Sequence, residues 1–433
     1  MTFSSPGSDL DRAVSRTVYA PPERRTARAV PVLFAHYGEP WIRGSERVLL
    51  DLLARVDRTR FLPFVWCNTS VFADAVTALD LPVRVTPMRQ LFGWDSPRFD
   101  VSTYRALVRE GAALLHEHGA ALVHANSGAP NQWLVPAARR AGVPLIAHLH
   151  AHYQLRDRVS LRLYEAPRIV GCSSWTVEPF LEDGVSAKRV RIIANGVDLE
   201  RIARGDAYAT RAELGLLPED LVIAGVGSLL RGKGWDVLLR AVRVLESRGL
   251  PTTLLLVGEG SCRGELERTA DELRIADRVH FLGERADAGA ILRDVTDIAV
   301  HPSRFESFGL AAAEAGAMGV PCVITDIPGL RDVVVHEQTG LHVPKDDPEA
   351  LADAIARLMN DRMLRRRLGA AAAAHVRHHF TAERMVEDFH SLYDELLTSR
   401  DSHTLPPSQR LWPVVTGGRR MIRRQLFGAS SRS

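Results

Sequence analysis

Lysine, cysteine and long apolar runs are scarce in this sequence. Lysine occurs only at Lys188, Lys233 and Lys345 among 55 basic residues. The four cysteines lie far apart, without the CxxC spacing of a zinc site or the pattern of a disulfide framework, which favours a reducing compartment. No stretch approaches the roughly 18 apolar residues of a membrane span, and residues 1–29 contain no signal-peptide core. We therefore expect a cytoplasmic protein without a membrane span.

An excess of charge of either sign is also lacking over most of the chain, because basic and acidic residues are nearly equal in number. The net charge of +3 argues against a surface that coats nucleic acid. From Arg400 onward there are seven arginines and one aspartate, so the excess lies in the C-terminal tail. With 433 residues, of which 46% are hydrophobic, the chain is long enough for two full-sized cores.

The middle of the chain alternates short apolar runs with longer amphipathic segments, a pattern typical of βα units and parallel sheets. We expect an α/β protein with two Rossmann-like parallel-sheet domains that face a cleft, because ligands bind outside the carboxyl ends of such strands. The predicted segments are a flexible leader at 1–29, an N-terminal domain at 30–193, a C-terminal domain at 194–380, a helix at 381–398 that could complete the first domain, and a basic tail at 399–433.

A glycine-rich loop follows the first predicted strand of the second domain. Gly227 to Lys233 has the GxxxxGK spacing of a P-loop, but Gly234 lacks the hydroxyl that such a loop uses to hold Mg²⁺. The loop, with Ser228, Arg231 and Lys233, could still hold a diphosphate without a metal at the helix start. The alternative is a tight turn with solvent-facing cations.

Two further strand ends are expected at the same edge of this sheet. Gly258 begins a Gly-Glu-Gly turn that would let a ligand approach the backbone. Phe281 lies in a strand, Val279 to Gly283, where a base could stack or bond to the backbone. A plain βα turn and an ordinary core strand explain these two patterns equally well.

Two glutamates stand eight residues apart in the stretch 301–316. Ser307 and Gly309 are typical of the loop and cap before a helix, so Glu306 is predicted at the mouth of a helix that carries Glu314. Amides at such a mouth favour phosphate or other polar oxygens. The alternative is a solvated helix start with an ordinary acidic residue.

In the first domain, Gly44 opens a predicted helix whose N-terminal amides point toward the cleft. His148, His150 and His152 alternate along and past a strand, as metal-binding HxH pairs do. No third-ligand cluster accompanies them, which leaves a single strand-end histidine acting by hydrogen bond, or structural histidines. Motifs for serine hydrolysis, zinc proteolysis and nicotinamide binding do not occur in the required context.

Taken together, these motifs resemble the retaining glycosyltransferases of family 4, which have the GT-B fold. The resemblance covers roughly residues 30–398. It rests on Glu306 to Glu314 as the E-x7-E signature, Gly-Ser-Glu-Arg at 44–47, Asn-Gly-Val-Asp at 195–198, Lys233-Gly234, Gly258-Glu259-Gly260 and Val279 to Gly283.

The resemblance implies a role for each matching residue. Glu306 and the amides of Phe308, Gly309 and Leu310 would contact the donor sugar and diphosphate. Glu314 would bind the ribose hydroxyls. Lys233 would neutralise the leaving diphosphate, His150 would contact the transferred sugar, and Gly44 would lie near the diphosphate. The catalytic candidates are thus His150, Lys233 and Glu306, and the further donor-binding candidates are Gly227, Ser228, Arg231, Gly258, Phe281 and Ser307.

One departure from the family concerns the cations. The family often has an arginine where this chain has Ser228, and Arg231 could replace it. Lys233, helix N-termini and amides would stabilise the leaving group, so we expect no metal and no cofactor beyond the nucleotide-sugar donor. Retention would follow from same-face attack by the acceptor hydroxyl. The alternative, a double displacement, needs a carboxylate beneath the anomeric carbon, a place that no residue clearly fills.

Alternatives to transfer remain open. A nucleotide-sugar epimerase of the same fold needs no acceptor, and a non-catalytic binder would neither hydrolyse nor transfer the donor. The nucleotide base, the sugar and the hydroxyl acceptor are not readable from the sequence, and no nucleic-acid partner is expected. The basic tail either lies on an anionic membrane, peripheral at its inner face and suited to a lipid-linked acceptor, or is disordered.

Overall fold

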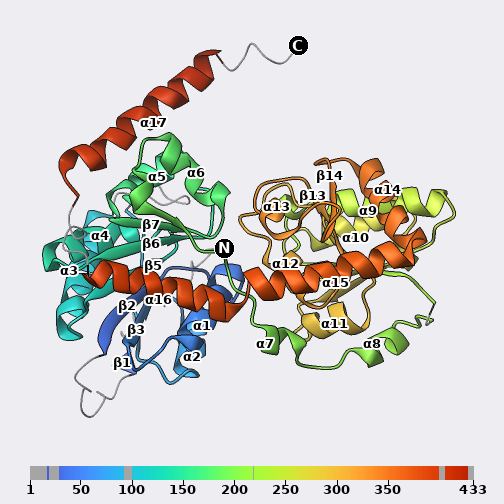
Figure 1. Cartoon of the computed structure of the whole chain (residues 1–433), viewed down its shortest axis with the longest axis horizontal. Helices are drawn as coiled ribbons and strands as arrows, with labels where there is room; N and C mark the ends of the chain where they lie inside the picture. The colour runs from blue at the N-terminus through green and yellow to red at the C-terminus, as the bar shows by residue number, and fades with distance from the viewer. Residues whose placement is uncertain (1–16, 19–28, 92–99, 218, 399–404, 428–433) are drawn as a thin grey trace, which may run out of the picture. The chain divides into compact units, whose positions relative to one another are not determined.

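The computed structural model describes residues 17–18, 29–91, 100–217, 219–398 and 405–427. The expected leader at 1–29 therefore lies outside the described residues, except for 17, 18 and 29. The chain divides into two compact units, each built around its own sheet (Figure 1). Unit 1 comprises Met1–Gly171, Thr176–Ile192 and Asp388–Ser433, and unit 2 comprises Cys172–Trp175 and Ile193–Glu387.

Unit 1 has an eight-stranded sheet in the order β1-β4-β3-β2-β5-β6-β7-β8, parallel except for the edge strand β1. The order reverses between β2 and β5, which is where such sheets bind ligands. The strands are β1 Thr17–Val18, β2 Val30–His36, β3 Phe61–Cys67, β4 Val83–Val85, β5 Leu122–Asn126, β6 Leu145–Leu149, β7 Arg168–Gly171 and β8 Val190–Ile192. The helices are α1 Gly44–Arg55, α2 Ser70–Thr77, α3 Val101–Glu117, α4 Asn131–Ala141, α5 Leu155–Ser160 and α6 Ser174–Glu182, with short turns η2 Leu163–Glu165 and η3 Ala187–Arg189.

Strand β2 shows how both faces of this sheet are covered. Its side chains alternate, so Leu33 joins the core beneath α3 and α4, whereas Phe34 faces the other side and packs edge-on against Tyr393. His36 lies on the same side as Phe34 and packs against Phe72 of α2. Figure 1 shows α3 and α4 on one side of the strands and α1 and α2 on the other.

Unit 2 has a six-stranded parallel sheet in the order β11-β10-β9-β12-β13-β14, which reverses between β9 and β12. One face packs against α9, α10 and α14, and the other against α11 and α12. The strands are β9 Val222–Val226, β10 Thr253–Val257, β11 Val279–Gly283, β12 Ile298–His301, β13 Cys322–Thr325 and β14 Gly340–Val343. The helices are α7 Leu199–Ala203, α8 Tyr208–Glu213, α9 Trp235–Ser247, α10 Arg263–Glu272, α11 Ala288–Asp294, α12 Leu310–Ala317, α13 Leu330–Val333, α14 Pro348–Asn360 and α15 Arg362–His379, with η4 Arg231–Lys233 and η5 Ala276–Arg278.

The prediction of two Rossmann-like parallel sheets is confirmed. The short apolar runs of the sequence correspond to the strands, and the longer amphipathic segments correspond to α1, α3, α4, α9, α10, α12 and α14 to α16. Short helices such as α2, α7 and α11 were not expected. The cleft between the domains stays a prediction.

Helix α16, Ala382–Thr398, contains the boundary between the units, because its residues up to Glu387 are assigned to unit 2 and those from Asp388 to unit 1. Its later part buries Phe389 and Tyr393, and both rings contact His124 of β5. This segment of the expected helix 381–398 therefore packs against the sheet of unit 1.

The C-terminal tail contains a long helix, α17 Pro407–Phe427, that packs against α5 and η2 of unit 1. The interpretation of residues 399–433 as disordered is therefore wrong for 407–427; residues 399–404 and 428–433 lie outside the described residues. Among the described helices, none combines the length and the apolarity needed to cross a bilayer.

Candidate functional site

The loops that follow β9, β10 and β11 in unit 2 are joined to one another through their backbones. The Gly227 amide donates to the carbonyl of Val257, and the Gly258 amide donates to the carbonyl of Gly283, at 2.9 and 2.7 Å. A Cβ at Gly258 would lie 2.1 Å from the Gly227 carbonyl oxygen, and Gly258 itself has φ +142°. Glycine is thus required here by the close approach of two backbones.

Gly234 joins the glycine-rich loop to the loop after β12. Its φ is +70°, and a Cβ there would lie 2.0 Å from the carbonyl oxygen of Pro302. A serine or threonine at this position would therefore be strained and would also collide with the neighbouring backbone. This contact explains why the loop has P-loop spacing up to Lys233 and departs from it at the next residue.

Arg304 fastens the same two loops from the side. Its guanidinium forms a bidentate pair with Asp236 at 2.8 Å, pairs with Asp346 at 2.6 Å and donates to the Arg231 carbonyl at 2.8 Å. The Arg304 amide also donates to the Gly232 carbonyl at 2.8 Å. The Arg304 side chain, through its hydrogen bond, lowers the pKa of Asp236 below its usual value. The loops after β9 and β12 therefore form one connected structure.

Lys233 and Glu306 are brought together by these loops. The Lys233 ammonium forms an ion pair with the Glu306 carboxylate, and both side chains remain partly accessible, at 30% and 19%. The other carboxylate oxygen accepts a bond from the Ser307 amide at 3.3 Å. The structure thus places two of the predicted catalytic residues in direct contact.

Helix α12 begins beside this pair. Gly309 precedes it with φ +94°, and the first bond into the helix is donated by the Ala313 amide to the Gly309 carbonyl at 3.0 Å. The amides from Gly309 to Ala312 come before that bond and have no partner within the helix. The amide group predicted at Gly309 and Leu310 is therefore at a helix N-terminus, whereas Phe308 is buried and its ring packs against Phe380.

Glu314 lies within α12, where its carboxylate pairs with Arg201 of α7 at 3.3 Å. Arg201 is placed by the turn at 195–198, because the Asp198 side chain accepts its amide at 2.9 Å and caps α7. Gly196 in this turn passes so close to Ala382 that a Cβ would lie 2.4 Å from its Cα. The Asn-Gly-Val-Asp turn is therefore structural, and it positions a partner for Glu314.

The remaining predicted residues of unit 2 lie around the same edge. The Ser228 carbonyl accepts a bond from the Trp235 indole at 3.0 Å. Arg231 is exposed, and its guanidinium has no hydrogen-bond or ion-pair partner among the described residues. Phe281 is half-buried, with the Arg263 guanidinium 5.9 Å from its ring centroid.

His301, at the end of β12, was not expected to belong to this site. It is buried, its Nε2 has no partner among the described residues, and burial, with the charge of Lys233 as a second cause, lowers its pKa to about 3. A neutral imidazole thus lies near enough to Lys233 for its charge to affect the pKa of the ring.

In unit 1, the helix start at Gly44 covers a buried pair of side chains. Gly44 is exposed with open space around it, but Glu46 is buried and hydrogen-bonded to His36 at 3.0 Å. Burial alone would raise the pKa of Glu46; the hydrogen bond and charge of His36 outweigh it and lower that pKa to about 2. A Cβ at Gly38 would lie 2.6 Å from the His36 ring, so the following loop passes directly over this pair.

Asn126 at the end of β5 connects this pair to His150. The Asn126 amide nitrogen donates to the Ser45 carbonyl at 3.2 Å, which leaves its oxygen to accept from His150 Nε2 at 2.8 Å. Burial lowers the pKa of His150 to about 3, so its ring is neutral. Nδ1, which has no partner among the described residues, therefore carries a lone pair.

His148 and His152, the other members of the alternating histidines, have different surroundings. His148 is buried, and its Nδ1 bonds to His124 at 3.1 Å, while His124 bonds to the Tyr393 hydroxyl at 2.7 Å. His152 is exposed. The structure therefore assigns His148 to the interior of unit 1, and His150 is the member whose bonds lead to the helix start at 44–46.

Sequence reasoning missed His36, Asn126, Arg201 and Arg304. His36 and Asn126 end β2 and β5, the strands at the point of order reversal, so the strand order would have identified both. Arg304 stands within the signature stretch, but nothing in the sequence names its two aspartate partners.

Comparisons with known proteins agree with this arrangement. Residues 207–375 match the family model for glycosyl transferases group 1, and residues 42–201 match that for glycosyltransferase family 4. Curated relatives include D-inositol 3-phosphate glycosyltransferases of Nocardia farcinica, 34% identical over 59% of this chain and 61% of the relative, and of Rhodococcus erythropolis, 31% identical over 74% and 82%. The matched region thus spans somewhat less than two thirds of the length of the Nocardia relative. It spans 54% of the length of the D-inositol 3-phosphate glycosyltransferase of Corynebacterium urealyticum.

Several solved structures have the same fold. HepE of Anabaena, in complex with UDP and glucose, has a TM-score of 0.73 and 23% identity over 84% of this chain and 99% of that chain. Sucrose-phosphate synthase of Thermosynechococcus elongatus has a TM-score of 0.70 and 24% identity over 85% and 99%. With both family models matched, and with a relative 31% identical over most of its length, the chain belongs to the glycosyltransferases of the group 1 and family 4 type.

Proposed function

We propose that the protein is a retaining glycosyltransferase that moves a sugar from a nucleoside-diphosphate sugar to an acceptor hydroxyl. The observation that carries this proposal is the Lys233–Glu306 ion pair at the start of α12, beside helix N-terminal amides. An ammonium and unpaired amides at one place suit a diphosphate. HepE structures that contain UDP and UDP-glucose support a nucleotide-sugar donor.

The ion pair resolves an electrostatic difficulty of this site. A carboxylate next to a diphosphate would repel it, but Lys233 offsets the charge of Glu306 before the donor arrives. Glu306 can then accept hydrogen bonds from sugar hydroxyls while the ammonium and the α12 amides meet the phosphate oxygens. As the glycosidic bond breaks, negative charge develops on the diphosphate, and these groups already face it.

Retention and metal independence are parts of the same proposal. The acceptor hydroxyl attacks from the face on which the diphosphate leaves, and a phosphate oxygen takes its proton. The cations and amides named above supply the stabilisation, so full activity is expected in excess chelator. In unit 1, His150 is the residue that we expect to contact the transferred sugar, and Asn126 holds its Nε2 as a hydrogen-bond donor.

The decisive experiment combines binding and transfer. Nucleoside-diphosphate sugars are first screened for protection against thermal unfolding. The donors that bind are then offered to hydroxyl acceptors, with D-inositol 3-phosphate, the compound in the names of the curated relatives, beside lipid-linked hydroxyls. NMR of the product is expected to show the donor's anomeric configuration. Interconversion of the donor without any acceptor would favour an epimerase, and a donor that binds but is never cleaved or transferred would favour a simple binder.

Glu314→Ala tests the donor end of the site. We expect nucleotide affinity to fall about 10- to 100-fold, as for a hydrogen bond to a charged group, measured by calorimetry with the nucleoside diphosphate alone. The matched control is Glu265→Ala, an exposed glutamate on α10 of the same unit, which leaves affinity unchanged. Unchanged affinity in Glu314→Ala would remove Glu314 from the site.

A further inference from the structure

Helix α17 is attached to unit 1 along one of its faces. Asp183, which is fully buried, pairs with Arg158 at 2.8 Å and with Arg420 of α17 at 2.9 Å. The Thr416 hydroxyl donates to the Asp183 carbonyl, and Gly417 lies so close that a Cβ would be 3.0 Å from the Asp183 carboxylate. These contacts fix which side of α17 faces the protein.

The opposite face of α17 is apolar and exposed. Leu411, Val415 and Ile422 are spaced so that they share one side of the helix, and their exposed fractions are 63%, 45% and 52%. Trp412 flanks them and is 56% exposed. Large apolar side chains grouped on one helix face normally mark a binding surface.

An exposed arginine lies beside this apolar face. Arg419 is exposed beside it, whereas Arg420 is used by the contact with Asp183. The side chains of residues 423–427 lie outside the described ones. No acidic residue occurs in the sequence after Asp401. An apolar face with cations and no carboxylates on the same segment is complementary to an anionic lipid surface.

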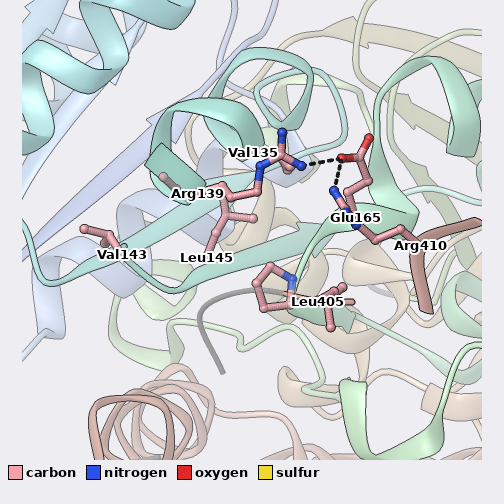
Figure 2. A pocket seen from close by; sticks show the side chains of 9 residues that line it. Val135, Arg139, Val143, Leu145, Glu165, Leu405 and Arg410 are labelled. Atoms are coloured by element: carbon pink, nitrogen blue, oxygen red, sulfur yellow. Dashed lines mark hydrogen bonds and ion pairs between the residues drawn. The ribbon is translucent and has the colours of Figure 1, made fainter. Parts of the chain in front are cut away.

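A groove beside α17 adds a second group of cations. Figure 2 shows Arg139 of α4 and Arg410 of α17 directed at the same carboxylate, Glu165. Arg162 pairs with that carboxylate as well, at 2.9 Å, so three guanidinium groups share one negative charge. The neighbouring hollow is lined by these arginines and by Val159, Leu411 and Val414. A region of excess positive charge therefore adjoins the apolar face, because Leu411 of that face lines the same hollow as the arginines.

We propose that the exposed face of α17, with the adjoining arginine groove, docks on the surface of an anionic lipid bilayer. Leu411, Val415 and Ile422 enter the boundary between headgroups and acyl chains, Trp412 lies at the headgroup level, and the arginines meet lipid phosphates. Asp183 holds the helix so that its apolar face points away from the sheet. This binding requires no nucleotide, so it is separate from the proposed transfer activity and is tested without it.

The test is co-sedimentation of the full chain with vesicles of phosphatidylcholine alone or mixed with phosphatidylglycerol. We expect binding to the mixed vesicles, weakened by salt, and little binding to phosphatidylcholine. Leu411→Glu/Ile422→Glu is expected to lower the apparent vesicle affinity at least about tenfold, and Arg419→Gln about fivefold. The matched control is Met363→Glu, an apolar residue 74% exposed on α15 of unit 2, which leaves binding unchanged. Thermal unfolding and nucleotide binding confirm that each variant is folded.

Several outcomes would overturn the proposal. One is equal sedimentation of the wild type and the Leu411→Glu/Ile422→Glu variant, and another is equal binding to the two vesicle types. Dimerisation without lipid that Leu411→Glu/Ile422→Glu abolishes, seen by analytical ultracentrifugation, would assign the face to a second copy of the chain. A single-stranded oligonucleotide that binds through the same face would assign it to nucleic acid.

Discussion

The polar residues at the carboxyl ends of the strands differ in kind between the two sheets. In unit 2, Lys233 and Glu306 are charged, partly exposed and carried on loops whose backbones touch one another. In unit 1, His150 is neutral and is held by Asn126, which also contacts the buried His36–Glu46 pair. The unit 2 residues are therefore charged and partly accessible to water, whereas those of unit 1 form a largely buried hydrogen-bond network.

This contrast separates two requirements of a transfer enzyme. A leaving diphosphate is stabilised by cations and amides that can stay in contact with water before the donor binds. A neutral sugar hydroxyl is recognised by geometry, so its partner needs a fixed tautomer and a rigid surrounding network. A substitution in unit 2 can therefore alter the charge stabilisation while leaving the hydrogen-bond network of unit 1 unchanged, and the reverse also holds.

The largest effect is expected when the glycine contact of unit 2 is broken. Gly234→Thr places a side chain against the Pro302 carbonyl at a φ of +70°, so we expect a loss of about 3 to 5 kcal/mol in the free energy of unfolding and loss of nucleotide binding. Urea unfolding and calorimetry measure the two effects.

Gly249→Ala is the control for backbone strain alone. Gly249 has φ +72° and open space around it, so the expected cost is about 1 to 2 kcal/mol with nucleotide binding retained. Equal behaviour of the two variants would mean that the contact with Pro302 does not support the site.

The second effect concerns charge. Lys233→Ala is expected to lower kcat about 100- to 1,000-fold, because a preorganised cation is removed from the developing charge. It also leaves Glu306 without its counter-charge, so nucleotide affinity falls too. In Lys233→Ala/Glu306→Gln, affinity is expected to recover in part while kcat stays low.

Lys188→Ala, an exposed lysine of unit 1, is the control and leaves both quantities unchanged. Arg231→Ala is expected to have a smaller effect than Lys233→Ala. Wild-type kcat in Lys233→Ala would exclude Lys233 from the chemistry.

The smallest expected effect is a difference between the two units in how their stability depends on pH. Burial lowers the pKa of His124 and His150 in unit 1 and of His301 in unit 2 to about 3. Burial also lowers the pKa of His148 in unit 1 well below its usual value. Their unfolded pKa is about 6.5, so the unfolded chain binds more protons between these values and stability falls as pH drops below 6.5.

Unit 1 carries three of these four imidazoles, so we expect its amide protection to fall more than that of unit 2 between pH 7 and pH 5. Native-state hydrogen exchange reports the two units separately. His148→Gln is expected to flatten the slope in unit 1, whereas His378→Gln, on the surface helix α15, leaves it unchanged. A larger loss in unit 2 would contradict the assignment of neutral buried histidines to unit 1.

The sequence predicted the parallel sheets well because apolar strands bounded by glycine leave a strong pattern. The sequence also predicted that Lys233, Glu306 and the start of α12 lie at one edge of the unit 2 sheet, because the carboxyl ends of parallel strands share an edge. It did not predict the pairs Lys233–Glu306, Glu314–Arg201 and Arg304–Asp236, because pairing depends on loop paths rather than on residue type.

Helix α17 was missed for a different reason. Pro413, Gly417 and Gly418 are typical of a chain that does not form helix. In the structure Pro413 is buried, and Gly417 lies where a Cβ would contact Leu155 and Asp183. The residues that lower the helix propensity of this segment are thus the ones that let α17 pack closely against unit 1. Helix propensity does not predict such packing, because it depends on tertiary contacts.

The glycine contacts of unit 2 have a consequence for which side chains of the glycine-rich loop can be replaced. Gly227, Gly234 and Gly258 set the course of the main chain by backbone contacts, while Leu230 and Arg231 of the same loop are exposed and Ser228 is half-buried. Substitutions at these three side chains alter what the loop offers to a ligand without moving its frame. A library randomised at 228, 230 and 231 should therefore retain the fold.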